Sequence, residues 1–104
     1  MKSTLTDDAN YCFFCGCPSE CDHHLIFGTS GRDFAEKYGL KVPICAKCHT
    51  ISVHKSDRIH DNPMAEKLSK MLGQMTWERD RALEGMDKEQ IRDRFIKERG
   101  VSYL

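Results

Sequence analysis

Two pairs of cysteines with metal-ligand spacing are the most informative feature of the sequence. Each pair, Cys12–Cys15 and Cys45–Cys48, has two intervening residues, and Gly16 follows the first pair. That spacing lets both sulfurs of one tight turn face the same ion at about 2.3 Å, and a glycine suits such a turn. We therefore predict a structural zinc site of four thiolates, which would supply folding free energy to a short chain. The alternative is a set of metal-free structural thiols.

The other two cysteines, Cys17 and Cys21, are surplus to this site, and we interpret them as free thiols, although either could replace a ligand of the first pair. All 6 cysteines lie in the first half of a chain of 104 residues. The N-terminus has a single positive residue, Lys2, and no apolar run of the kind found in signal peptides. We therefore expect the reducing cytoplasm, where clustered cysteines bind metal rather than form disulfides.

The histidines form a second group, and all 5 of them lie beside the cysteines. His23 and His24 are adjacent on an expected strand, so their side chains face opposite ways, and one can bind a metal while the other faces a different group. His49 directly follows the second cysteine pair, and His54 and His60 come next. We predict a second metal site with imidazole ligands, an open coordination position and a spare base. The alternative is a set of surface or core histidines without a chemical role.

The elements expected to position these residues are short. The apolar run 24–27 predicts a buried strand. A helix is expected over 33–38, ended by Gly39. The alternating residues 40–44 predict a second strand, in which Pro43 indicates an edge. A helical turn that begins after Cys45 and carries His49 is expected.

Two longer helices are expected in the remainder of the chain. Asn62 as N-cap and Pro63 at the first helical position predict a helix that continues to about Leu83. A last helix over 88–99 would be ended by Gly100 and would bury two apolar residues, Ile91 and Phe95. In the first of these helices apolar residues recur at helical spacing and form a stripe. We expect this stripe to be part of the core, and the alternative is a partner-binding groove or a dimer face. Its members are Met64, Leu68, Met71, Leu72 and Met75.

Length and charge limit the function classes. One small domain is expected from 104 residues, divided into a flexible leader (1–10), a zinc-ribbon core (11–62) and a helical extension packed on that core (63–104). The formal net charge is zero, which argues against a generic basic coat for nucleic acid, and the only basic excess falls between residues 31 and 60. No apolar run approaches a membrane span, so no membrane partner is expected. The predicted fold class is a small α+β domain stabilised by zinc.

The motifs together form a longer pattern: Cys12-x-x-Cys15-Gly16, His23-His24-Leu25-Ile26, Val42-Pro43-Ile44-Cys45-x-x-Cys48-His49, Ile59-His60 and Gly100-Val-Ser-Tyr-Leu104. This pattern resembles the HNH endonucleases that contain a zinc ribbon, and in particular small HNH-like proteins of bacteriophages and prophages. The resemblance implies a ββα-metal fold, in which two strands and a helix surround one catalytic cation. It also implies a metal-dependent DNA endonuclease or nickase that leaves 5′-phosphate and 3′-hydroxyl ends.

Roles for single residues follow from that resemblance. His24 would be the general base, while His23 and His49 would hold the catalytic cation, which could be Mg²⁺, Mn²⁺, Ni²⁺ or Zn²⁺. Arg32 would bind an adjacent phosphate, or else be an exposed helix charge. The middle Asn of the family has no counterpart in residues 39–42.

The last ligand of this second site stays open between two histidines. His54 follows His49 by five positions, about 140° around a regular helix, so one straight helix cannot present both to one ion. Proximity in sequence favours His54, whereas the resemblance, through Ile59-His60, favours His60.

DNA is the partner that the resemblance implies, together with phage packaging or recombination proteins; the oligomeric state is open. The competing function is a non-catalytic zinc-ribbon module that binds DNA or a protein partner. That alternative explains the four paired cysteines but leaves the His23–His24 pair and His49 without a role. A zinc-dependent deaminase or protease lacks its sequence signature.

Overall fold

The computed structural model describes all 104 residues and contains one two-stranded antiparallel sheet. Strand β1 (Cys21–His24) pairs with β2 (Lys41–Ile44), so that His23 lies opposite Val42. Each strand has only one neighbour, and Pro43 therefore lies in an edge strand, as predicted, where a missing N–H is tolerated.

The strand expected over 24–27 is wrong in its position, because β1 ends at His24. Leu25 and Ile26 are fully buried, but they follow the strand and pack against a helix, and only one further backbone bond, from the N–H of Leu25 to the carbonyl oxygen of Leu40 over 2.9 Å, extends the pairing beyond His24. A short apolar run does not reveal which kind of neighbour buries it.

Helix α1 (Gly31–Tyr38) connects the two strands and agrees with the expected helix. It ends at Gly39, whose φ of 69° is in the left-handed region that glycine adopts without steric cost. The leader contacts this end of α1, since the N–H of Thr4 donates to the carbonyl oxygen of Gly39 over 3.0 Å. The flexibility of the leader stays a prediction.

After β2 the chain makes three short helical turns before the long helix begins. The first, η1 (Lys47–Ile51), is a single π-helical turn and carries His49; it takes the place of the expected helical turn. Two 3₁₀ turns follow, η2 (Lys55–Asp57) and η3 (Ile59–Asp61). The ββα-metal arrangement stays a prediction, because no regular α-helix directly follows β2.

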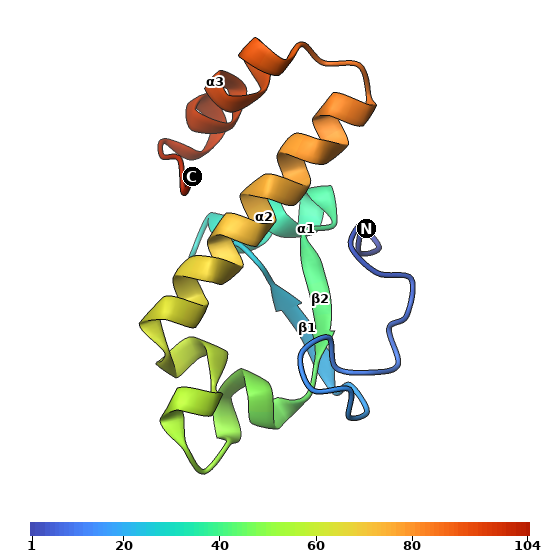
Figure 1. Cartoon of the computed structure of the whole chain (residues 1–104), viewed down its shortest axis with the longest axis vertical. Coiled ribbons are helices and arrows are strands. Elements are labelled where there is room, and N and C mark those ends of the chain that lie inside the picture. The colour runs from blue at the N-terminus through green and yellow to red at the C-terminus, as the bar shows by residue number, and fades with distance from the viewer.

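The two C-terminal helices agree with the sequence. Helix α2 (Pro63–Leu83) begins after Asn62, whose Oδ1 accepts from the N–H groups of Met64 and Ala65 at 3.1 and 3.2 Å. This cap satisfies two donors that the first helical turn leaves free. Helix α3 (Lys88–Arg99) folds back beside α2 and ends at Gly100 (Figure 1). None of these helices combines the length and apolar composition that a bilayer span requires.

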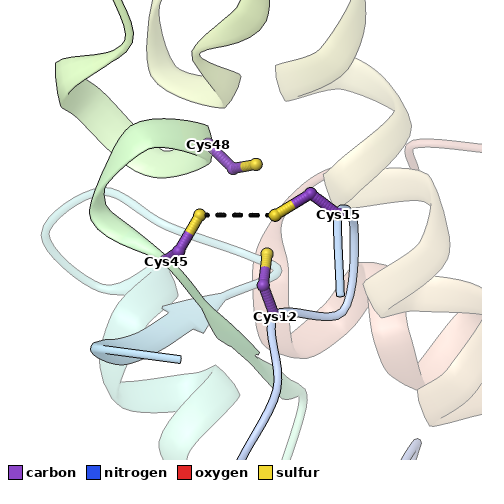
Figure 2. Close-up of side chains that lie close together, drawn as sticks. All are labelled: Cys12, Cys15, Cys45 and Cys48. Atoms are coloured by element: carbon purple, nitrogen blue, oxygen red, sulfur yellow. Dashed lines mark hydrogen bonds between the residues drawn. The ribbon is translucent and has the colours of Figure 1, made fainter. Parts of the chain in front are cut away.

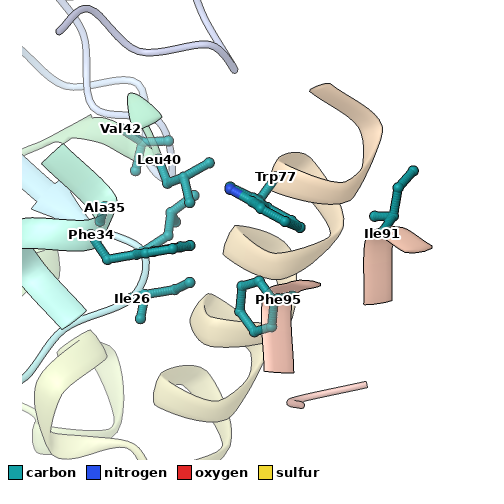
Figure 3. Packing of buried hydrophobic residues seen from close by; sticks show 9 residues of the cluster. Ile26, Phe34, Ala35, Leu40, Val42, Trp77, Ile91 and Phe95 are labelled. Carbon is teal, nitrogen blue, oxygen red and sulfur yellow. The ribbon is translucent and has the colours of Figure 1, made fainter. Parts of the chain in front are cut away.

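An aromatic core joins α2 to the elements on both sides of it. Trp77 of α2 is fully buried, and its ring centroid lies 6.2 Å from that of Phe34 in α1 and 5.4 Å from that of Phe95 in α3 (Figure 3). Ile91 is buried on the same face of α3, as predicted. These contacts hold the long helix in a fixed position over the sheet and α1.

Most of the apolar stripe of α2 is exposed, so the expectation that the stripe forms the core holds only for Leu72, which packs against the core cluster. Met64, Leu68 and Met75 are 72%, 55% and 57% exposed. The face that packs instead contains Gly73, where an added Cβ would lie only 2.8 Å from Cγ1 of Ile26. The absence of a side chain at Gly73 lets α2 approach Leu25 and Ile26 closely, and Trp77, one turn further along the same face, packs between Phe34 and Phe95.

Candidate metal centres

Four cysteine sulfurs from two separate segments meet at one end of the sheet (Figure 2). The first segment is a tight turn in which the N–H of Gly16, at φ 78°, donates to the carbonyl oxygen of Cys12 over 3.0 Å. Cys45 and Cys48 come from the segment that leaves β2 and enters η1. The Sγ atoms of Cys15 and Cys45 are 3.5 Å apart, and all four sulfurs lie within 4.8 Å of one another. This cluster could hold a metal ion, as the spacing predicted.

The surroundings of the cluster shift the pKa values of two of its thiols in opposite directions. Burial opposes ionisation of Cys12, but the backbone N–H groups of Cys45, Cys15 and Phe14 outweigh burial and lower the pKa of Cys12 to about 6. Burial, together with hydrogen bonds to the thiols of Cys15 and Cys45, raises the pKa of Cys48. Backbone donors therefore favour one thiolate, and a cation would favour ionisation of the others.

The two surplus cysteines lie outside this cluster. Cys17 and Cys21 are both exposed and free of disulfides, and neither belongs to the group of four converging sulfurs. The set of four ligands is therefore the one that the paired spacing predicts.

Three histidines from three different elements form a second cluster. His23 comes from β1, His49 from η1 and His60 from η3, and one nitrogen of each ring lies within 4.8 Å of the others. The ring centroids are 5.5 Å apart for His23 and His49, 5.1 Å for His23 and His60, and 4.6 Å for His49 and His60. These three rings could hold a second metal ion.

The hydrogen bonds of His23 determine which of its nitrogens is free. The Ser69 hydroxyl oxygen is 2.8 Å from the carbonyl oxygen of Leu25 and 2.8 Å from Nε2 of His23. A hydroxyl has one proton, so Ser69 donates to the carbonyl and accepts from the Nε2–H group of His23. The lone pair of the neutral ring is then on Nδ1, a buried atom without a hydrogen-bond partner. This is the form in which histidine binds metal.

The other two rings have outer partners of the same kind. Nδ1 of His60 lies 3.3 Å from a carboxylate oxygen of Glu66, which can only accept a proton, so Nε2 is left free. Nδ1 of His49 is 3.9 Å from the Cys21 sulfur, a longer contact. An outer acceptor on one ring nitrogen is typical of metal-ligating histidines, because it orients the ring and fixes its tautomer. The donor set of the cluster therefore fits a cation.

Burial favours the neutral form of two rings of this cluster, His23 and His49. His23 is 1% exposed; burial, and then repulsion by the other histidines, lowers its pKa to about 3. Burial and His60 also lower the pKa of His49. A neutral imidazole offers a lone pair to a cation, whereas an imidazolium repels one.

The structure separates the two candidates for the last ligand. His60 belongs to the cluster, whereas His54 is exposed, precedes η2 and lies outside the cluster. His49 is on a π-helical turn, and the chain then makes two 3₁₀ turns that bring His60 back to it. Of the two alternatives that the sequence left open, the geometry is compatible with His60.

One groove joins the histidine cluster to the other predicted functional residues. It has a volume of roughly 270 Å³, and His24 and Arg32 line it together with the three clustered rings. Its remaining lining residues are Cys21, Asp22, Phe27 and Gly28. Arg32 is exposed and makes no ion pair. The predicted base and the predicted phosphate ligand thus lie beside a candidate cation site.

Sequence reasoning missed a carboxylate that contacts His24. Oε2 of Glu36 accepts from Nε2–H of His24 over 2.7 Å, and Lys41 donates to the same carboxylate. The hydrogen bonds from His24 and Lys41 lower the pKa of Glu36 to about 2. The spacing of Arg32 and Glu36, four positions apart on one helix, is the signal that could have indicated a shared face.

Comparison of this chain with models of known protein families, with curated proteins and with solved structures finds no match. The resemblance to HNH endonucleases therefore stays a prediction based on the motifs quoted above.

Proposed function

We propose that this chain is a metal-dependent DNA endonuclease or nickase of the HNH type, with a structural zinc ion held by the four cysteines. One observation carries the proposal: three imidazoles that fit a cation share a groove with a separate, carboxylate-bound histidine and an unpaired arginine. A binding module has no use for a free base beside a cation site. Metal-assisted hydrolysis of a phosphodiester uses both.

His23, His49 and His60 would hold the catalytic cation, for which we propose Mn²⁺, Ni²⁺ or Zn²⁺, because three imidazoles do not suit Mg²⁺, which prefers oxygen ligands. When bound, the cation supplies positive charge that neutralises the phosphoryl oxygens and the leaving 3′ oxygen. His24 takes a proton from water as that water attacks phosphorus, the bond between phosphorus and the 3′ oxygen breaks, and the 3′ oxygen takes a proton from solvent water. The products are a 3′-hydroxyl and a 5′-phosphate.

Glu36 positions the proposed base. Because a carboxylate only accepts, the proton of the neutral His24 ring is on Nε2, and Nδ1 is the nitrogen that can accept a proton from water. Lys41 keeps the carboxylate ionised and in place. The family's middle Asn is missing from this chain, and we propose that Glu36 orients the base instead.

Arg32 would hold a phosphate next to the one that is cleaved. It lines the groove, is exposed and has no carboxylate partner. A guanidinium can bind two phosphate oxygens at once, which fixes the strand relative to the cation.

The test is nicking of supercoiled plasmid by the full chain with each divalent cation in turn. We expect relaxation that needs a cation and that falls at least a hundredfold in His24→Ala, the size typical of a lost general base. Glu36→Ala should lower the rate on the order of tenfold to a hundredfold, because the ring loses its orienting acceptor. Plasmid retardation without cleavage under every cation would contradict the enzyme and support the binding module.

A matched control variant distinguishes a loss of His24 orientation from a general effect of removing a carboxylate on the fold. Asp93→Ala removes an exposed carboxylate of α3 that forms no ion pair and does not line the hollows around His24, so its nicking rate should equal that of the wild type. Equal rates for Glu36→Ala and the wild type would show that Glu36 does not position the base.

A further inference from the structure

A second unpaired cation lies behind one wall of the groove. The Lys70 ammonium group of α2 is 4.7 Å from the ring centroid of Phe27 and 5.8 Å from that of Tyr103. It makes no ion pair, although the chain forms 10 of them. A half-buried ammonium held only by ring faces keeps its charge available to an anion.

Phe27 connects this ammonium to the histidine cluster. Its ring centroid is 4.8 Å from that of His60 and 5.9 Å from that of His23, and Phe27 itself lines the groove. The Lys70 ammonium is thus separated from the candidate cation site by the thickness of one aromatic ring. A chain of four methylenes lets it move from the ring face towards the mouth of the groove.

The position of Lys70 is set by the C-terminal segment. Gln74, one helical turn further along α2, is fully buried, and its Oε1 accepts from the N–H of Tyr103 over 2.6 Å. Its Nε2 donates to the Ser102 hydroxyl over 3.0 Å. These bonds hold the Tyr103 ring against Lys70, so that two aromatic rings border the ammonium and no carboxylate neutralises it.

We infer that Lys70 forms a phosphodiester subsite for the DNA strand, on the Phe27 side of the histidine cluster, whereas Arg32 binds on the α1 side. This inference rests on the proposed function for the identity of the ligand. The two unpaired cations come from different helices: Arg32 lines the groove, and Lys70 contacts Phe27, which lines it. A chain of zero net charge would then bind the strand through local cations, not through a basic surface.

The test measures DNA affinity in the non-cleaving His24→Ala background, with Mn²⁺ and a fluorescein-labelled DNA duplex as the probe. Lys70→Gln should raise Kd several-fold at low salt and reduce the slope of log Kd against log salt by about 0.9, the value for one lost phosphate contact. Lys70→Arg keeps the charge and should retain most of the affinity.

Lys88→Gln is the matched control, since it removes an exposed, unpaired lysine near the start of α3, beyond the far end of α2 (Figure 1). Its Kd and salt slope should equal those of the background, and thermal melting should show all variants folded. An unchanged Kd and salt slope in folded Lys70→Gln would overturn the subsite. Plasmid nicking by the chain that keeps His24 would still support the endonuclease in that case. If Lys70→Gln lowers the affinity for DNA but the chain with His24 nicks no plasmid under any cation, the subsite is supported and the endonuclease is rejected.

Discussion

Replacing Cys45 by serine is expected to unfold the sheet end of the molecule and to abolish zinc binding. Cys45 is 4% exposed and packs in a small buried cluster with Cys12, Ile44 and Ile59. This cluster and a backbone hydrogen bond from the N–H of Phe13 to the carbonyl oxygen of Pro43 over 2.8 Å join the first cysteine turn to β2, and a bound ion would add four bonds to that small interface. Structural zinc contributes roughly 10 to 16 kcal/mol in small zinc domains, which is comparable to the whole stability of a domain, about 5 to 15 kcal/mol.

The measurement is thermal unfolding followed by circular dichroism, together with zinc content per chain. Cys45→Ser should contain no zinc at the cysteine cluster and should lose its cooperative transition, and a strong chelator should produce the same result in the wild type. Cys17→Ser is the matched control, because Cys17 is exposed and lies outside the cluster, so it should melt as the wild type does. A Cys45→Ser protein with wild-type melting would contradict a structural role for the ion.

Removing one clustered imidazole should eliminate nicking without unfolding the chain. We expect His49→Ala to lose about a thousandfold in rate, since several kcal/mol of charge stabilisation disappear with the cation. His49 is only partly buried, so the fold and the zinc at the cysteines should remain. Plasmid nicking and manganese titration of the same samples provide the two readouts.

The comparison of His60→Ala with His54→Ala decides the last ligand. His60→Ala should behave as His49→Ala does, whereas His54→Ala should nick and bind manganese as the wild type does, because His54 is exposed and outside the cluster. The opposite pattern would mean that the chain after η1 adopts another arrangement when the cation binds.

The parts of the structure that the sequence predicts are those with local causes. Paired cysteines, the Asn62 cap and the left-handed Gly39 and Gly100 act through their immediate neighbours, and each lies where it was expected. Local chemistry of this kind is independent of how the elements later pack.

The parts that sequence reasoning missed depend on contacts between distant residues. Ser69 selects the tautomer of His23 across 46 positions, and Glu36 reaches His24 from the helix between the strands. The buried face of α2 depends on the close approach that Gly73 allows, which the hydrophobic pattern does not encode. Such effects follow from tertiary packing and override the local pattern.

Crystals of the full chain grown with manganese and zinc, with anomalous scattering recorded at both absorption edges, provide the most direct measurement. We expect two separate ions in each chain. One, zinc, should lie about 2.3 Å from the four cysteine sulfurs, and the other should contact Nδ1 of His23 and one nitrogen each of His49 and His60. A single ion at the sulfurs, with the three imidazoles turned away from one another, would contradict a catalytic cation site and with it the proposed hydrolysis.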